Sequence, residues 1–279
     1  DIRERALGPG HPEVAASLQI IGLALESQGK LPEALDVYLR GLEIYERALG
    51  PDHPNVAVSL TNVGNVRLRR GELAEGLACH GRALAIHERA QGPEHPDVAR
   101  AQTNVGRALA ELGQADEALA SYQRGLAILE ARLGPDHPQV ATSLGILASI
   151  HLGAGAHAEA KATCERALGI VEARLGPEHP EAAALLMCLA EVSLVEQRPH
   201  DAIPLAQRAL ELRERAGVGV DFVEEARFVL ARALWEAPAD GGQDRSKAVT
   251  LAERAREGFR ADDQAWPVEL AAVEAWLAE

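Results

Sequence analysis

The chain has 279 residues, of which 47% are hydrophobic and 25% are charged, so it can bury a sizeable core and is neither a disordered tail nor a membrane protein. Aromatic residues make up only 3%, which favours helices packed through small side chains. The formal net charge of −14 argues against nucleic-acid binding, because a nucleic acid is itself a polyanion. No apolar run approaches the roughly 18 residues of a membrane-spanning helix, so we expect no membrane partner.

The three cysteines are an odd number without paired spacing, which favours reduced thiols and a cytoplasmic location. Cys79, Cys164 and Cys188 each fall in a helical apolar stripe, so we expect buried and unreactive thiols. The chain begins at Asp1 rather than Met and shows no signal peptide, which indicates a piece of a longer protein.

An internal repeat dominates the sequence. The string Gly-Pro-acid-His-Pro occurs four times, and an earlier copy has Gly10 in place of the acid. Its first glycines are spaced by 42 residues without insertion or deletion: Gly8, Gly50, Gly92, Gly134 and Gly176. A register this regular indicates a stack of similar structural units.

Each period predicts a helix, a tight turn, a second helix and a longer loop. In the first unit Pro12 opens the first helix, Gly29 ends it, and Pro32 opens the second. Where the two helices must approach most closely the residues are small, which lets their axes come within about 8–10 Å. These small residues are Gly22, Gly64, Gly106, Ala148 and Ala190. The sequence therefore predicts an all-α, right-handed superhelical α-solenoid of antiparallel helix pairs.

These residues resemble the tetratricopeptide repeat (TPR). Gly22, Ala34, Tyr38 and Gly41 stand where that family's signature has a small residue, an alanine, an aromatic ring and a second small residue. The 42-residue period with its LGPDHP linker is similar to the long-helix repeats of kinesin light chains and of bacterial regulators, including serine/threonine kinases. The resemblance covers about residues 1–215 and implies a protein-interaction fold without naming a ligand.

Three positions depart from the signature. Gly76 replaces the expected alanine, and Cys164 and Ala206 replace the large ring, so we expect looser packing in those units. The linker motif is absent beyond residue 212, but residues 222–235 and 246–259 still predict a helix pair, separated by a loop at 237–244.

Six of the nine aromatic residues fall in the last part of the chain, where large rings can close the apolar face of a terminal repeat. The register then divides the chain into the end of a truncated upstream repeat (1–7), repeats 1 to 5 (8–49, 50–91, 92–133, 134–175 and 176–217), a degenerate repeat 6 (218–260) and a C-terminal capping helix (261–279, helical over 267–277).

The histidines do not predict a metal site. The five linker histidines are His11, His53, His95, His137 and His179. Equivalent points on stacked repeats lie about 8–10 Å apart, too far for nitrogens that must each lie about 2 Å from zinc, so we expect these residues to cap helices. His80 and His87 replace tyrosines of the first unit and are expected in the packed face. No phosphate-binding loop, HExxH motif, kinase motif or nucleophile elbow occurs, so we expect neither cofactor nor enzyme activity in this segment.

A binding groove remains as the functional hypothesis. In stacked helix pairs the first helices line the concave surface, where their polar residues can face a ligand. Arginine can hold a carboxylate in a two-pronged contact, and asparagine can bracket a peptide backbone. In related arrays, an asparagine at the place of Asn62 and Asn104 contacts the bound peptide. The candidate groove residues are Asn62, Asn65, Arg69, Arg100, Thr103, Asn104, Arg107 and Glu111.

Two further readings of the groove remain open. These side chains can instead be ordinary solvated residues, with pairs such as Arg107 with Glu111. Gly145, Ile146 and Leu152, together with Met187, offer a more apolar stretch that can receive a hydrophobic side chain.

The expected function is a noncatalytic scaffold that binds a peptide or helix of a partner protein, with an acidic or C-terminal segment as the favoured ligand. One alternative is a regulatory arm of a larger signalling enzyme, either a bacterial serine/threonine kinase or a nucleotide-driven switch with its catalytic domain upstream of Asp1. Another is a self-associating structural module. The sequence leaves the oligomeric state open.

Overall fold

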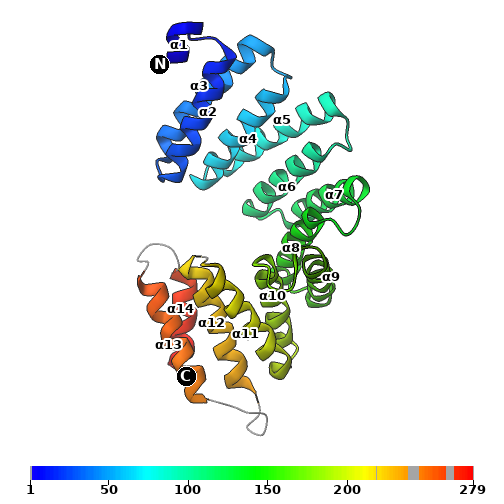
Figure 1. Cartoon of the computed structure of the whole chain (residues 1–279), viewed down its shortest axis with the longest axis vertical. Helices are drawn as coiled ribbons and strands as arrows, with labels where there is room; N and C mark the ends of the chain where they lie inside the picture. Colours follow the sequence, from blue (N-terminus) through cyan, green and yellow to red (C-terminus); the bar gives the residue numbers. More distant parts are fainter. Residues whose placement is uncertain (1, 218, 238–244, 262–266, 279) are drawn as a thin grey trace. The chain divides into compact units, whose positions relative to one another are not determined.

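The structure is a computed structural model that describes residues 2–217, 219–237, 245–261 and 267–278. Over these residues the chain forms fourteen α-helices and divides into two compact units, Asp1–Pro135 and Asp136–Glu279 (Figure 1). The first unit holds α1 (Ile2–Leu7), α2 (Pro12–Ser27), α3 (Leu31–Leu49), α4 (Pro54–Arg69), α5 (Leu73–Gln91), α6 (Pro96–Glu111) and α7 (Ala115–Leu133). The second unit holds α8 (Pro138–Gly153), α9 (His157–Leu175), α10 (Glu181–Val195), α11 (Pro199–Ala216), α12 (Val220–Glu236), α13 (Arg245–Ala261) and α14 (Pro267–Leu277).

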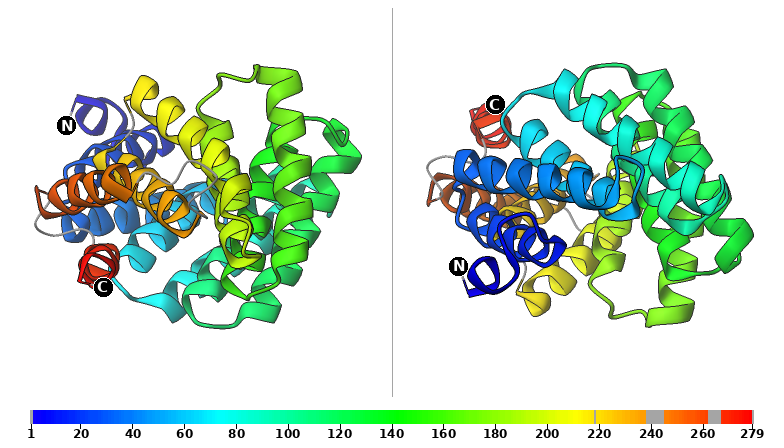
Figure 2. Two further views of the ribbon diagram at one scale, coloured as in Figure 1. Left: turned by 90° about the horizontal axis from the view of Figure 1, so that it is seen from below. Right: turned by 90° about the horizontal axis from the view of Figure 1, so that it is seen from above.

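Successive helices pack as antiparallel pairs, and within each unit every pair contacts the next in chain order. In the first unit α2 packs on α3, α4 on α5 and α6 on α7, and Figure 1 shows these pairs one after another along the unit. Figure 2 gives two further views of the helices. The predicted all-α solenoid of helix pairs is confirmed. Each pair buries its apolar face against its neighbours, so the core runs along each unit rather than forming one central cluster.

The repeated linker fixes where each first helix begins. Its glycine adopts a positive φ, 90° at Gly50 and 88° at Gly92, a conformation that strongly favours glycine. The linker histidine then caps the helix, because its Nδ1 accepts a hydrogen bond of 3.1–3.3 Å from the backbone N–H two residues further on. The predicted capping role is confirmed for His11, His53, His95 and His137. His179 makes the same hydrogen bond, but α10 begins one residue later, with Pro180 at its N-cap position.

The small residues of the first helices lie against rings of the second helices. A Cβ atom added to Gly64 or Gly106 would lie 2.8 or 2.9 Å from the facing ring, closer than side chains pack. The three such pairs are Gly22 with Tyr38, Gly64 with His80, and Gly106 with Tyr122. At the equivalent buried positions of the next two repeats, Ala148 and Ala190 are accompanied by the smaller Cys164 and Ala206. The first helix gains a methyl group where the second helix loses its ring.

The expected looser packing at Gly76 is wrong. A Cβ atom there would lie 2.6 Å from Cδ2 of Leu68, so the leucine side chain already occupies the space of the missing methyl group. Leu68 is buried, whereas the equivalent residue of the first repeat is the half-buried Glu26. In this repeat a larger side chain on the first helix therefore compensates for the smaller residue on the second helix. The signature position alone could not show this.

Some of the aromatic residues of the last helices pack together as predicted, and others do not. Trp276 of α14 makes edge-to-face contacts with Phe228 and Trp235 of α12, with ring centroids 6.0 and 5.4 Å apart. Phe259 is also buried, but Phe222 is 51% exposed and does not join this cluster. Trp266 and residues 238–244 of the predicted loop lie outside the described residues.

Candidate functional site

The first helices α4 and α6 carry the eight predicted groove residues, and three of these residues share one cavity. Asn62, Arg100 and Asn104 line a cavity of about 190 Å³ between α4, α5 and α6. The other predicted residues, Asn65, Arg69, Thr103, Arg107 and Glu111, lie on the same two helices but do not line it. Thr103 instead bonds back to the carbonyl of Ala99, at 3.2 Å.

Side-chain amides connect the first two repeats. The Asn62 amide donates to Oε1 of Gln19 at 2.8 Å, and the Gln19 amide donates to the Ser59 hydroxyl at 2.9 Å. These bonds run between α2 and α4 and fix the orientation of Asn62. Asn104, the equivalent residue one repeat later, lines the cavity without a side-chain hydrogen bond to any described residue.

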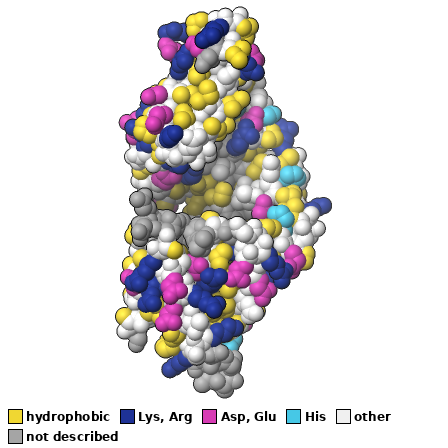
Figure 3. Space-filling view, turned by 60° about the vertical axis from the view of Figure 1, so that its left-hand side comes forward, with side chains coloured by type: hydrophobic (Ala, Val, Ile, Leu, Met, Phe, Trp, Pro, Cys, Tyr) yellow, Lys and Arg dark blue, Asp and Glu magenta, His cyan; other side chains and the backbone are white. Residues whose placement is uncertain are grey.

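The predicted arginines are less free than the sequence suggested. Arg69 pairs with Glu26 at 2.9 Å, and Arg100 pairs with Asp97 at 2.7 Å. Arg107 donates to Oδ1 of Asn65 on α4, so the suggested pairing with Glu111 is not the bond it makes. The positive charge on this face is therefore partly neutralised, in keeping with a surface on which acidic and basic side chains are interspersed (Figure 3).

Two of the lining residues, the buried His87 and the half-buried Asp97, are connected through the exposed Gln91. Nδ1 of His87 lies 3.2 Å from the amide oxygen of Gln91, whose amide nitrogen donates to Asp97 at 2.9 Å. Burial raises the pKa of the Asp97 carboxyl, but the Gln91 hydrogen bond and the charge of Arg100 outweigh it and leave that pKa below its usual value. Burial lowers the pKa of His87, which favours the neutral ring at neutral pH.

His87 and Asp97 line the cavity but are not among the groove residues predicted from the sequence. His87 is 5% exposed, as expected of a packed residue, and yet its ring lines the cavity. The available signal was the tyrosine-to-histidine replacement at a position facing the next repeat. His80, the other such replacement, is 1% exposed and lies in the packed face as predicted.

A second cavity, of about 320 Å³, lies in the other unit between α8, α9 and α10. Gly145 and Ile146 line it, in agreement with the apolar stretch that the sequence indicated. Leu152 and Met187 are not among its lining residues, and Met187 is only 4% exposed because it points into the core.

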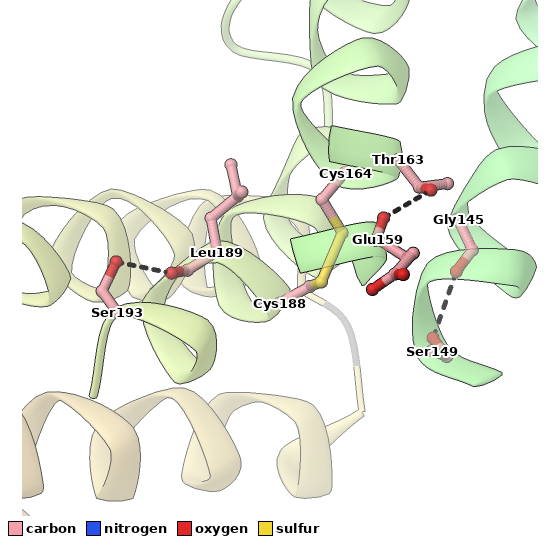
Figure 4. Close-up of a disulfide and its surroundings, with 8 residues drawn as sticks. All are labelled: Gly145, Ser149, Glu159, Thr163, Cys164, Cys188, Leu189 and Ser193. Carbon is pink, nitrogen blue, oxygen red and sulfur yellow. Dashed lines mark hydrogen bonds between the residues drawn. A yellow bond between two sulfur atoms is a disulfide. The ribbon is translucent and has the colours of Figure 1, made fainter. Parts of the chain in front are cut away.

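The expectation of three reduced thiols is wrong. Cys164 of α9 and Cys188 of α10 form a disulfide that lines this second cavity, with Cα atoms 6.7 Å apart (Figure 4). Their separation of 24 residues hid the pair, because the antiparallel packing of α9 and α10 brings the middles of the two helices together. The argument from cysteine spacing to a reducing compartment therefore fails. Cys79 is the free cysteine, and burial raises the pKa of its thiol.

The described part of the chain holds no group of three or more His, Cys, Asp or Glu residues arranged to bind a metal ion. Among its helices, none combines the length and apolar character that crossing a membrane requires.

Comparison with known proteins identifies the class. The chain matches the tetratricopeptide repeat family over overlapping segments at residues 1–47, 19–75, 56–131, 109–173 and 139–215. It therefore belongs to the tetratricopeptide repeat family, whose domains are generally protein-interaction modules. None of the curated proteins matches the chain.

Solved structures show the same fold at low sequence identity. A kinesin-light-chain-type protein of Podosopora anserina with nearly identical TPR-like repeats is 23% identical, with a TM-score of 0.63 over 74% of this chain and 98% of that one. BtubC from P. vanneervenii is 17% identical, with a TM-score of 0.67 over 88% and 94%. A Rap protein complexed with competence and sporulation factor is 16% identical, with a TM-score of 0.62 over 94% and 72%.

Proposed function

We propose that this chain is a noncatalytic interaction module that binds an extended segment of a partner protein on the face formed by α4 and α6. The observation that carries the proposal is the cavity of about 190 Å³ in which Asn62, Arg100 and Asn104 meet. Amide groups at the mouth of a cavity can donate to and accept from a peptide backbone, whatever the side chains of that peptide.

The favoured ligand is an acidic segment or a C-terminal carboxylate. Arg100 is an exposed cation at the cavity, and Arg107 on the same helix is bonded to an amide rather than to a carboxylate. A carboxylate of the ligand can therefore exchange with Asp97 at Arg100 or add to Arg107 in a charge-assisted hydrogen bond. The net charge of −14 repels nonspecific anions elsewhere on the surface, which favours a ligand that also makes the amide contacts. The Rap protein of the comparison, which holds a factor in its structure, supports ligand binding by this fold.

The test is selection from a displayed library of random twelve-residue peptides with free carboxyl termini. Peptides enriched on the wild-type protein should carry acidic residues or use their terminal carboxylate. They should bind the double variant Arg100→Glu/Arg107→Glu at least tenfold more weakly, since truncated charge pairs at an interface cost about 2–5 kcal/mol. They should also bind the double variant Asn62→Ala/Asn104→Ala about tenfold more weakly, because each backbone group of the peptide left without its hydrogen bond costs about 1–3 kcal/mol.

Arg124→Glu on α7 is the matched control, because Arg124, like Arg100, is an exposed arginine in an ion pair, with Glu88 at 2.7 Å. Loss of either exposed pair should change stability by only about 0–1 kcal/mol, so a folding defect would not imitate the binding defect. Equal affinity of the selected peptides for the wild type and both double variants would show that the ligand binds another surface.

A further inference from the structure

We propose that the cavity of about 320 Å³ between α8, α9 and α10 is a second ligand site, which takes a large apolar side chain followed by a basic residue of the ligand. The proposal rests on the proposed function only in that the occupant is a segment of a partner protein. The site, its chemistry and its test are separate from those of the polar cavity.

The repeat register makes the two cavities equivalent. Every residue that lines the polar cavity has its counterpart, two 42-residue periods later, in the wall of this second cavity. At three of these positions a polar residue is replaced by an apolar one: Asn62 becomes Ile146, His87 becomes Val171, and Arg100 becomes Ala184. The carboxylate of Asp97 is kept as Glu181, and Val58 becomes Thr142. The same position in the repeat therefore offers hydrogen bonds in one unit and an apolar surface in the other.

The second cavity is also larger, for a reason visible in the sequence. Its wall includes Cys164, at the position where the three upstream repeats place the rings of Tyr38, His80 and Tyr122. It also includes Ser149, the counterpart of the longer Asn65. Shorter side chains at both positions leave room for an aromatic or branched aliphatic side chain from outside, whose burial is favourable in an apolar wall.

The disulfide helps to hold this space open. It links the buried Cys164 of α9 to Cys188 of α10, while Gly145 and Ser149 stand on α8 opposite (Figure 4). Two of the three helices that form the cavity are thus covalently joined at its wall. A pre-formed cavity loses less conformational freedom when a ligand enters it.

The carboxylate of Glu181 determines which ligand residue is favoured next to the apolar side chain. Glu181 lines the cavity at the place of Asp97, but Asp97 is paired with Arg100, whose counterpart is Ala184. The Glu181 carboxylate has no ion pair with any residue that the structure describes, and it is exposed. A lone carboxylate beside an apolar cavity complements a ligand in which an arginine or lysine adjoins the apolar side chain.

The experiment measures the fluorescence anisotropy of three labelled hexapeptides that share the frame Gly-Ser-X-Z-Ser-Gly. The Phe-Arg peptide should bind the wild-type protein. The Ala-Arg peptide should bind about tenfold more weakly than the Phe-Arg peptide, because it buries no ring. The Phe-Glu peptide should bind at least about threefold more weakly than the Phe-Arg peptide, because its carboxylate is repelled by that of Glu181. Gly145→Leu should weaken the Phe-Arg peptide about tenfold by filling the cavity. A Cβ atom at Gly145 makes only an ordinary contact, 3.5 Å from Leu185, so this variant should fold.

The matched control is Thr61→Leu, because Thr61 is the counterpart of Gly145 in the polar cavity. It should leave the Phe-Arg peptide unaffected, and Glu181→Gln should abolish the preference for Arg over Glu. If the Phe-Arg peptide binds no better than the Ala-Arg peptide, or binds Gly145→Leu as well as the wild type, the proposal is overturned. Either result leaves the proposed function standing, since that is tested on Arg100 and Arg107 with different peptides.

Discussion

His80 differs in chemistry from the residues that occupy its position in the neighbouring repeats. Tyr38 and Tyr122 place phenol rings there, and the Tyr38 hydroxyl reaches Glu26 at 3.2 Å. His80 is 1% exposed, and neither of its ring nitrogens has a hydrogen-bond partner among the described residues. Burial, together with the positive charge of Arg107, lowers the pKa of His80 to about 4. The folded protein therefore holds a neutral imidazole where an unfolded chain would protonate it.

This shift predicts a loss of stability in mild acid. Above the unfolded pKa of about 6.5, both states hold a neutral ring and the group has no pH-dependent effect. As the pH falls from about 6.5 to 4, the unfolded chain binds a proton that the folded chain does not, which lowers the free energy of unfolding by about 3 kcal/mol in total. His80→Phe should remove this component and still fit, because the two neighbouring repeats hold the six-membered rings of Tyr38 and Tyr122 at this position.

Urea unfolding of the wild type and of His80→Phe at pH 7.5, 5.5 and 4.5 checks this expectation. The difference between the two proteins should grow in favour of the variant as the pH falls. Parallel curves for the two proteins would mean that His80 is accessible to protons in the folded state.

At the scale of the helices, the close approach within each pair depends on two positions together. Gly106 of α6 faces Tyr122 of α7, and an added Cβ atom would lie 2.9 Å from the ring. Ala148 and Cys164 at the equivalent positions of the next repeat show the other solution, a larger residue on the first helix and a smaller one on the second. The helix contact thus constrains the sum of two side chains rather than either alone.

We predict that Gly106→Ala destabilises the protein by about 1–3 kcal/mol, since overpacking outweighs the roughly 1 kcal/mol gained in helix propensity. The same change should cost about 1 kcal/mol less in a Tyr122→Cys background, which a double-mutant cycle of urea midpoints would measure. Gly81→Ala is the control, because an added Cβ atom there has no neighbour within 4 Å, and it should stabilise α5 by up to about 1 kcal/mol. Additive effects of the two substitutions would show that the two side chains do not compete for space.

Ion pairs between successive second helices repeat with the same period. In each pair an arginine of one second helix reaches a glutamate 36 residues earlier, on the preceding second helix or on α1. The pairs are Arg40 with Glu4, Arg82 with Glu46, Arg124 with Glu88, and Arg208 with Glu172. They are partly exposed, so each contributes about 0–1 kcal/mol and serves mainly to favour the observed register.

At the scale of the whole molecule, stability is the sum of contacts between neighbouring repeats, because no repeat buries its apolar face alone. The disulfide adds a covalent link to one of these contacts, joining α9 of the fourth repeat to α10 of the fifth. It closes a loop of 24 residues, which restricts the unfolded chain by an amount worth about 3 kcal/mol.

The double variant Cys164→Ala/Cys188→Ala should therefore unfold at lower urea concentration than the oxidised wild type, and dithiothreitol should lower the midpoint of the wild type but not that of the double variant. Hydrogen exchange should show the largest loss of protection in α8 to α11, with smaller losses further along the second unit, because neighbouring repeats unfold as coupled elements. Cys79→Ala, which leaves the disulfide intact, is the control, and dithiothreitol should lower its urea midpoint as it does that of the wild type. Equal midpoints for the oxidised wild type and the double variant would contradict the expected contribution.

Much of this fold followed from the sequence because its signals are local and periodic. The 42-residue register, the glycines that need a positive φ and the histidine-proline pairs at helix starts depend on residues a few positions apart, so the helices and their pairing order could be predicted. The groove residues could be placed on their helices for the same reason, since a helical face follows from spacing.

Only the tertiary structure decided what those residues do. It paired Arg69 of α4 with Glu26 of α2, turned Arg107 of α6 toward Asn65 of α4, and joined two cysteines that are 24 residues apart. It also showed that the lining positions of one cavity recur two periods later in a second cavity, with apolar residues in place of Asn62, His87 and Arg100. Hydrogen bonds, disulfides and cavities depend on which side chains from different helices come within a few ångströms of each other, and periodicity fixes the helices without fixing those distances.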